Sequence, residues 1–348
     1  MNRLQSNVDT VQAAQIIAGA QTVVVLTHAK PDGDAFGAVV ALTVALRRLG
    51  KRVRGILSPP ILGGMQALRG AAQVEVADGP ADLGRPDLVV VVDTAAWSQL
   101  APLDVAVRPL LDRTMVIDHH LNGDMTAAWR CVDGQAAAAC EIVAQIIDHL
   151  AEQTKGDLWT STVREAVFAG IASDTGWFRF SNTRPRTHRL AARLIEAGVD
   201  HAELYRKIEQ TERPQKLALM IRALDSLELL ADGRVALMVL RRSDFEQCGA
   251  NDEETERFVD VPQIVDGVDV VVLAAEQAFE TAHGKQLRTR LSFRSKPGPG
   301  AVNVAALAER YGGGGHARAA GAKVEKPMDD VLETLRGVLI GDLPVDRD

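Results

Sequence analysis

Cysteine is scarce in this sequence, and long apolar runs are absent. Only three of the 348 residues are cysteines, Cys131, Cys140 and Cys248, and no two of them form a Cys-x-x-Cys pair. A small, odd and widely spaced set predicts reduced thiols and a cytoplasmic protein rather than a disulfide-bonded secreted one. The first ten residues are polar and lack the apolar core of a signal peptide. Apolar runs such as residues 88–92 are far shorter than the roughly 20 residues of a membrane span.

Positive charge and aromatic side chains are also limited. The formal net charge of −7 argues against DNA binding through a generally basic surface, although a local pocket can still hold a small anion. Aromatic residues make up 4 % of the chain, which disfavours long single strands stacked on aromatic platforms. The apolar fraction of 47 % suffices for a sizeable core, and 348 residues predict two or three domains.

Short apolar runs in the first half of the chain end in polar residues that can bind metal. Residues 22–27, 88–92 and 113–117 are typical of buried strands, and helical segments such as 35–49 separate them. This alternation predicts an α/β fold with a doubly wound parallel sheet, whose ligand site lies at the carboxyl ends of the strands. The polar residues expected there are His28, Asp32, Asp34, Asp93, Asp118, His119 and His120, with Asp174 at the end of the predicted helix 160–173.

Each of these polar groups has a simpler structural interpretation when it is taken alone. Asp32-Gly33-Asp34 could form a turn and a helix cap, Asp93 could be an N-cap, and Asp174 could end a helix. Their recurrence at several strand ends favours a metal centre. Imidazoles and carboxylates without a thiolate favour Mn²⁺ or Mg²⁺ over Zn²⁺. Because the set holds more donors than one ion needs, it predicts two ions joined by a bridging carboxylate.

The second half of the chain predicts a helical connector and a smaller α/β domain. The connector is rich in charge, lacks strand character and is interrupted near Pro214. Strands are predicted at 235–240, 269–275 and 286–295, before a helix at 302–311 and a glycine-rich segment at 312–321. The expected limits are 1–200 for the metal-binding domain, 201–230 for the connector and 231–348 for the substrate-binding domain, with the active-site cleft between the two domains.

Basic charge is concentrated in the second domain. Residues 285–326 contain nine Lys or Arg and only two Glu. Arg294 is the best candidate for gripping a phosphate, because a guanidinium binds phosphate with two hydrogen bonds. A four-glycine run alone is more often a flexible loop, but its successive backbone N–H groups can also surround an anion. The predicted substrate-binding residues are Arg294, Gly313, Gly314, Gly315 and His316.

The polar pattern resembles that of the DHH phosphoesterase superfamily. The matching residues are His28-x-x-x-Asp32-x-Asp34, Asp93, Asp118-His119-His120 and Asp174, in that order. The segment 312–321 resembles the signature of the DHH-associated C-terminal domain. Within the superfamily, the stretches 27–35, 173–178 and 181–183 resemble the nanoRNase/pAp phosphatase branch.

The resemblance implies a division of roles among these residues. One ion would be held by His28, Asp32 and Asp93, and a second by Asp34, Asp93, His119 and Asp174, so that Asp93 bridges them. The residues given a catalytic role are Asp93, Asp118, which would orient a histidine, and His120, which would face the scissile phosphate. The expected cofactor is a pair of Mn²⁺ ions, with Mg²⁺ or Co²⁺ as substitutes.

The expected activity is that of a two-metal phosphoesterase that hydrolyses short oligoribonucleotides to mononucleotides. It would also dephosphorylate nucleotide 3′,5′-bisphosphate (pAp), and linear or cyclic dinucleotides are further candidate substrates. No membrane and no stable duplex DNA are expected as partners, and a homodimer is left open. Three alternatives remain: a family II inorganic pyrophosphatase, disfavoured by the segment 312–321; a RecJ-type single-strand exonuclease, disfavoured by length and charge; and a nucleotide-binding sensor without activity.

Overall fold

The computed structural model describes residues 2–61, 63–281, 284–298, 301–341 and 343. The chain divides into two compact units, Met1–Thr211 (unit 1) and Glu212–Asp348 (unit 2). This division lies inside the segment predicted as a connector. That segment is helical, with α9 (His201–Glu209) in unit 1 and α10 (Pro214–Asp225) in unit 2.

Unit 1 is built on a six-stranded sheet in which every neighbouring pair is parallel. Its order is β4-β3-β2-β5-β6-β8. The strands are β2 (Thr22–Ala29), β3 (Arg52–Ser58), β4 (Glu75–Val76), β5 (Leu88–Val92), β6 (Thr114–Asp118) and β8 (Trp129–Val132). The chain runs outward from β2 through β3 to β4, and then returns to build β5, β6 and β8 on the other side of β2. The strand order therefore reverses between β2 and β5, the place where open α/β sheets bind ligands.

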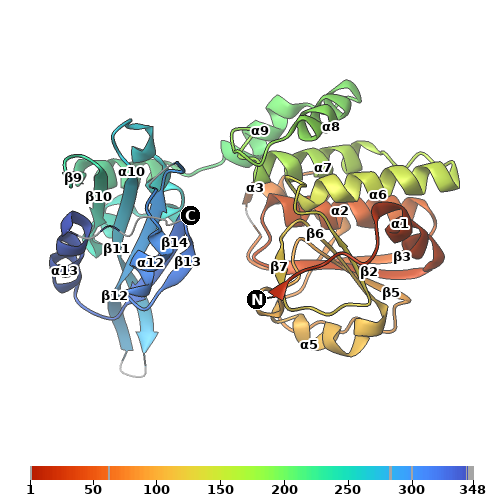
Figure 1. Ribbon diagram of the computed structural model, residues 1–348, viewed down its shortest axis with the longest axis horizontal. Coiled ribbons are helices and arrows are strands. Elements are labelled where there is room, and N and C mark those ends of the chain that lie inside the picture. The colour runs from red at the N-terminus through yellow and green to blue at the C-terminus, as the bar shows by residue number, and fades with distance from the viewer. Residues whose placement is uncertain (1, 62, 282–283, 299–300, 342, 344–348) are drawn as a thin grey trace. The chain divides into compact units, whose positions relative to one another are not determined.

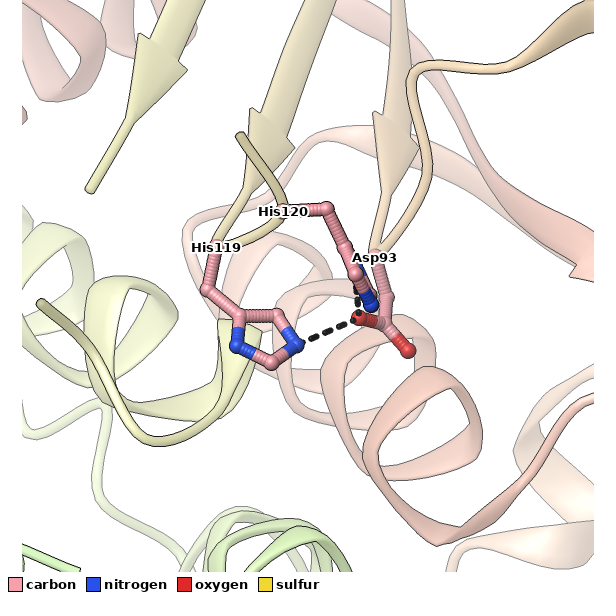
Figure 2. A group of neighbouring side chains, drawn as sticks. All are labelled: Asp93, His119 and His120. Atoms are coloured by element: carbon pink, nitrogen blue, oxygen red, sulfur yellow. Dashed lines mark ion pairs between the residues drawn. The ribbon is translucent and has the colours of Figure 1, made fainter. Parts of the chain in front are cut away.

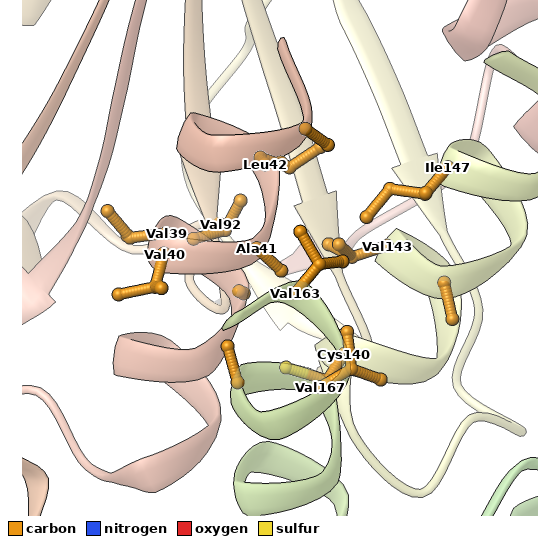
Figure 3. Close-up of a cluster of buried hydrophobic side chains, with 14 of the residues drawn as sticks. Val39, Val40, Ala41, Leu42, Val92, Cys140, Val143, Ile147, Val163 and Val167 are labelled. Atoms are coloured by element: carbon orange, nitrogen blue, oxygen red, sulfur yellow. The ribbon is translucent and has the colours of Figure 1, made fainter. Parts of the chain in front are cut away.

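Helices cover both faces of this sheet (Figure 1). On one face lie α1 (Thr10–Gly19), α2 (Gly33–Arg48), α6 (Ala139–Thr154) and α7 (Ser161–Asp174). On the other lie the short α4 (Trp97–Leu100) and α5 (Asp104–Val107). Helix α2 is apolar around nearly its whole circumference because it is enclosed between the sheet and the helices α6 and α7, whose side chains meet it in Figure 3. A Cβ at Gly37 would collide with the backbone carbonyl of Ala166, so glycine allows α2 and α7 to approach closely.

The remaining elements of unit 1 are small or peripheral. A two-residue bridge joins β1 (Asn2–Arg3) to β7 (Asn122–Gly123). Helix α3 (Gly63–Gln66) follows β3, and α8 (Pro185–Glu196) precedes α9. Short 3₁₀ segments occupy Ala71–Gln73 and Arg108–Arg113.

Unit 2 contains a mixed six-stranded sheet of order β13-β14-β12-β11-β10-β9. Among its described strands, only β10 and β11 are parallel. The strands are β9 (Glu228–Leu230), β10 (Val235–Leu240), β11 (Val270–Thr281), β12 (Gly284–Ser295), β13 (Gly314–His316) and β14 (Ala319–Val324). Helices α12 (Val304–Glu309) and α13 (Met328–Gly341) pack on one face. Helices α10 and α11 (Arg242–Cys248) and the 3₁₀ segments Asp252–Thr255, Phe258–Asp260 and Pro262–Ile264 border the other.

The structure confirms the predicted fold class and corrects several local assignments. Residues 71–77, whose β-branched and apolar content favours a strand, form a 3₁₀ turn followed by the two-residue β4. Segment 312–321 was expected as a loop but contains the hairpin β13–β14. The three cysteines are free thiols, as predicted. In the described part of the chain, no helix combines the length and apolar character needed to cross a membrane.

Candidate metal centre

Two strands place the first polar residues at the point where the sheet order reverses. His28 lies near the end of β2, and Asp93 directly follows β5. The hydroxyl of Thr27 donates to the Val92 carbonyl at 2.7 Å, which fixes the ends of the two strands together. The Asp93 N–H donates to the Ile117 carbonyl of β6 at 2.9 Å, so the ladder extends to the next strand. Asp93 has φ 60°, a left-handed conformation that aspartate tolerates better than most residues.

Asp93 lies at the centre of the histidine contacts (Figure 2). Its Oδ1 is 3.3 Å from His119 Nε2 and 3.8 Å from His120 Nδ1, and its Oδ2 is 3.5 Å from His28 Nε2. The side chain of Asp93 is only 3 % exposed. His28 Nδ1 donates to the Ala29 carbonyl at 2.9 Å, so Nε2 is the ring nitrogen that faces Asp93 and can bind a metal ion once its proton is lost. Both carboxylate oxygens of Asp93 thus have an imidazole nitrogen beside them.

Asp32 and Asp34 combine a structural role with a place in this cluster. Asp32 is the N-cap of α2, and its Oδ1 accepts from the N–H groups of Asp34 and Ala35, each at 3.0 Å. Asp34 is fully buried and accepts from the N–H groups of Ala139 and Cys140. The N-cap residue of α6, Ala138, offers no side-chain acceptor. Asp34 therefore caps α6 from a different helix. The same side chain also lies beside His119 and Asp174.

Asp118 is the last residue of β6, and its side chain and those of His119 and His120 lie in different surroundings. Asp118 is fully buried and accepts from the His120 N–H at 3.0 Å and from His120 Nδ1 at 2.9 Å. His119 Nε2 lies 3.2 Å from Asp174 Oδ2, at the end of α7. The His120 side chain is 58 % exposed, whereas that of His119 is 13 % exposed. His120 therefore lies on the solvent-exposed side of the cluster, and its hydrogen bond to the buried Asp118 fixes the orientation of its ring.

The predicted polar residues other than Asp118 fall into three overlapping groups, and within each group the potential ligand atoms lie within 4.8 Å of one another. These groups are His28, Asp32 and Asp93; Asp34, His119 and Asp174; and Asp93, His119 and His120. Asp93 Oδ1 and His119 Nε2 are buried without a properly oriented hydrogen bond within the described residues. A buried polar atom in that state costs about 1–3 kcal/mol, and a bound cation removes the cost. The donor set and its orphaned atoms fit divalent metal ions.

Several buried carboxylates and histidines lie close together at the centre, and this proximity shifts their pKa values. Burial disfavours the imidazolium of His28, but its hydrogen bonds to Asp93 and Ala29 raise the pKa of His28 to about 9. Burial also disfavours the imidazolium of His119, but the adjacent carboxylates of Asp174 and Asp93 raise the pKa of His119 to about 11. Burial and the charge of Asp93 raise the pKa of Asp34 well above its usual value. In the metal-free protein, protons therefore occupy positions that cations can take.

Sequence reasoning missed the residues that hold the loop before α6. Asn182 Nδ2 donates to the carbonyls of Ala137 and Asp174, each at 3.1 Å. The Ala137 N–H donates to the buried carboxylate of Glu141, which lies 2.9 Å from the Arg186 guanidinium. Asn182 thus ties the segment that precedes α6 to the end of α7. The 181–183 stretch was noted only as a resemblance, and nothing local to Glu141 and Arg186 indicates their pairing across 45 positions.

A left-handed turn follows Asp174. Gly176, Trp177 and Phe178 all have positive φ, between 54° and 66°. This conformation costs about 1–2 kcal/mol for each non-glycine residue. The Phe178 N–H donates to the hydroxyl of the buried Thr175 at 3.0 Å, and the Trp177 indole donates to Glu209 of α9 at 2.9 Å. Both aromatic rings pack against the unit 1 core, so the turn anchors α7 to its neighbours.

In unit 2, the predicted substrate residues already have structural contacts. Arg294 on β12 donates through Nε to Asp260 at 3.1 Å. The N–H groups of Gly312 and Gly313 donate to carbonyls at the end of α12, so they do not fit the expected role of anion donors. Gly314, Gly315 and His316 are exposed and form the edge strand β13.

Family models match most of the chain. The model for the DHH family, N-terminal domain, matches residues 22–171, and the model for the DHHA1 domain matches residues 234–340. The first match contains every residue of the three groups except Asp174. The second contains the whole hairpin β13–β14.

Named relatives extend over nearly the full length. The chain is 31 % identical over 317 residues to the bifunctional oligoribonuclease and PAP phosphatase NrnA of Thermus thermophilus, covering 90 % of this chain and 88 % of that protein. It is 29 % identical to the protein of the same name from Bacillus subtilis, covering 87 % and 89 %. Among solved structures, an exopolyphosphatase-related protein of Bacteroides fragilis superposes with a TM-score of 0.81 at 22 % identity, covering 94 % and 95 %.

Proposed function

Because this chain belongs to the DHH phosphoesterase family and carries a DHHA1 domain, we propose that it hydrolyses short oligoribonucleotides to mononucleotides and dephosphorylates pAp. The observation that carries the proposal is the set of three overlapping His/Asp groups where the sheet order reverses. Its specificity is supported by the relatives at 31 % and 29 % identity, whose names state both activities.

Two divalent ions, with Mn²⁺ as the proposed species, would supply an activated water and neutralise charge on the phosphoryl oxygens. His28, Asp32 and Asp93 would hold one ion, and Asp34, Asp93, His119 and Asp174 the other. This division follows the first two groups, with Asp93 between them. Backbone N–H groups donate hydrogen bonds to the carboxylates of Asp34 and Asp32, and these bonds fix both side chains before an ion binds. Such fixed donors reduce the reorganisation that binding would otherwise require.

His120 is the proposed proton donor to the leaving oxygen. Its Nδ1 is held by Asp118, so Nε2 is the nitrogen that can reach a substrate on the exposed side. The hydrogen bond that His120 donates to Asp118 raises the pKa of His120 and so favours its imidazolium form. Asp118 itself is buried and acts by holding the ring. Arg294 and the exposed residues Gly314, Gly315 and His316 remain the proposed contacts for substrate phosphate.

A substrate panel tests the proposal. The full chain is incubated with Mn²⁺ and pAp, oligoribonucleotides of two to five residues, cyclic dinucleotides or pyrophosphate, and the products are separated by chromatography. We expect mononucleotide from the oligoribonucleotides and phosphate from pAp, both abolished by EDTA and restored by Mn²⁺. Cleavage of pyrophosphate with no release from oligoribonucleotides or pAp would overturn the proposal, as would equal activity in the presence of EDTA.

A further inference from the structure

One face of the unit 2 sheet is apolar over some strands and polar over others. On β12, Leu291 and Phe293 point into the core beneath α12 and α13. The alternate residues Arg290, Ser292 and Arg294 therefore point to the opposite face. On that face, the apolar cluster with α10 and α11 covers β10 and β11 but contains no residue of β12 or β14 among those described. The sheet therefore presents a polar surface over β12 and β14.

Two cations lie directly opposite each other on this surface. Arg290 pairs in register with Lys323 of β14. Like charges in this position destabilise an antiparallel pair, and they are compensated when an acid lies nearby. Arg294, two residues along the same face from Ser292, has Asp260 as its partner, and Arg288 donates to Gln277. Within the described residues, neither Arg290 nor Lys323 has a hydrogen bond or an ion pair through its side chain.

The two cations line a hollow of about 430 Å³. Its other walls include Ser292, Gly312, Gly313 and Gly321. A Cβ at Gly313 would collide with the Gly321 carbonyl and with Ala322, so the glycine backbone lies directly against β14. Because the N–H groups of Gly312 and Gly313 are bonded to α12, the cationic side chains are the groups in this hollow that can neutralise an anion.

We propose that Arg290 and Lys323 form a phosphate subsite that binds a second phosphate of an oligonucleotide and thereby favours substrates longer than a mononucleotide. The inference rests on the proposed function. Arg290 is four residues from Arg294 on β12, a separation of about 13 Å at the rise of an extended strand. An oligonucleotide with several phosphates can therefore contact Arg290 and Arg294 at the same time. The shorter pAp, with two phosphates, can make fewer of these contacts. The unpaired charges on paired strands are neutralised only when such a substrate is bound.

The test compares substrates of different length in the wild type and in Arg290→Gln/Lys323→Gln. With Mn²⁺ present, kcat/KM is measured for pAp and for oligoadenylates of two, three and four residues, at several salt concentrations. We expect the ratio of kcat/KM for the tetranucleotide to that for pAp to fall at least tenfold in the variant. The dependence of log KM on log salt for the tetranucleotide should also decrease in slope by about 0.7, since one phosphate contact to a single strand is lost.

Arg85→Gln/Lys155→Gln is the matched control, since it removes the same charges from two exposed positions of unit 1. The single variant Lys323→Gln, at an exposed position, keeps the test decisive if the double variant unfolds, which thermal unfolding would show. An unchanged length ratio in folded variants overturns the subsite, as does an equal change in the control. Absence of turnover by the wild type on every nucleotide substrate would instead refute the proposed function.

Discussion

Replacement of Asp93 by asparagine keeps the shape of the side chain and removes its charge. In the metal-free protein, Asp93 contacts His28, His119 and His120. The rise of the His28 pKa from 6.5 to about 9 corresponds to roughly 3 kcal/mol of net differential interaction, and the hydrogen bond to Asp93 is the largest contribution that raises the pKa. We expect the variant to lose that stabilisation and the pKa of His28 to fall toward its ordinary value. NMR titration of the histidine ring protons in EDTA would measure the change.

The same substitution should disrupt metal binding and turnover. If Asp93 bridges two ions, Asp93→Asn leaves each ion with a neutral amide in place of a shared carboxylate. We expect one tightly bound Mn²⁺ at most, measured by calorimetry and by loss of the exchange-coupled two-manganese EPR signal. Turnover should fall by about 10³-fold or more, since about 4 kcal/mol of lost charge stabilisation equals three powers of ten in rate. Asp112→Asn, at an exposed carboxylate outside the centre, is the control. Two tightly bound ions with near-normal turnover in Asp93→Asn would refute the bridging assignment.

Three further predictions concern the centre. His120→Gln should retain both ions and lose about 10²-fold or more in kcat with little change in metal affinity, because the ring lies on the open side; a parallel loss of metal by calorimetry would contradict this. Because the folded-state pKa values of His28 and His119 are raised, they stabilise the metal-free protein fully below about pH 6.5, and this contribution is lost as pH rises through about 9 and then about 11. Denaturation in EDTA should show that loss, while Mn²⁺ titrations should show tighter binding as pH rises from about 6.5 to about 8.5, since fewer protons compete for the ligands. Gly170→Ala should destabilise the protein by about 1–3 kcal/mol, because the added Cβ collides with Cys140 Sγ; an unchanged urea midpoint would contradict this.

The parallel sheet and its polar strand ends were predictable because each depends on local pattern. The run Leu88–Val92 is uniformly apolar, and the fully buried β5 matches it. Asp93 follows immediately, so its place at the carboxyl end of the sheet is determined by the strand. The order of the strands was not encoded locally, and the reversal between β2 and β5 appears only in the folded sheet. That reversal is what brings His28 beside Asp93.

The contacts that sequence reasoning missed connect residues far apart in the chain. Asp34 caps α6 more than a hundred positions away, and the cap is invisible locally because Ala138 carries no polar group. The left-handed turn at 176–178 includes two aromatic residues, which have no preference for that conformation. The glycine-rich segment 312–315 suggested a loop with free N–H groups, which is not what the structure shows. Its first two N–H groups end a helix, and the following glycines form an edge strand.

Every residue of the candidate metal centre lies between His28 and Asp174, and the unit that contains them ends at Thr211. During synthesis, this part of the chain leaves the ribosome first, and the remaining residues follow over roughly ten seconds or more. Unit 1 can therefore fold and acquire metal while Arg294 and the hairpin β13–β14 are still untranslated. The order of translation would then assemble the half proposed to bind metal ions before the half proposed to bind phosphate.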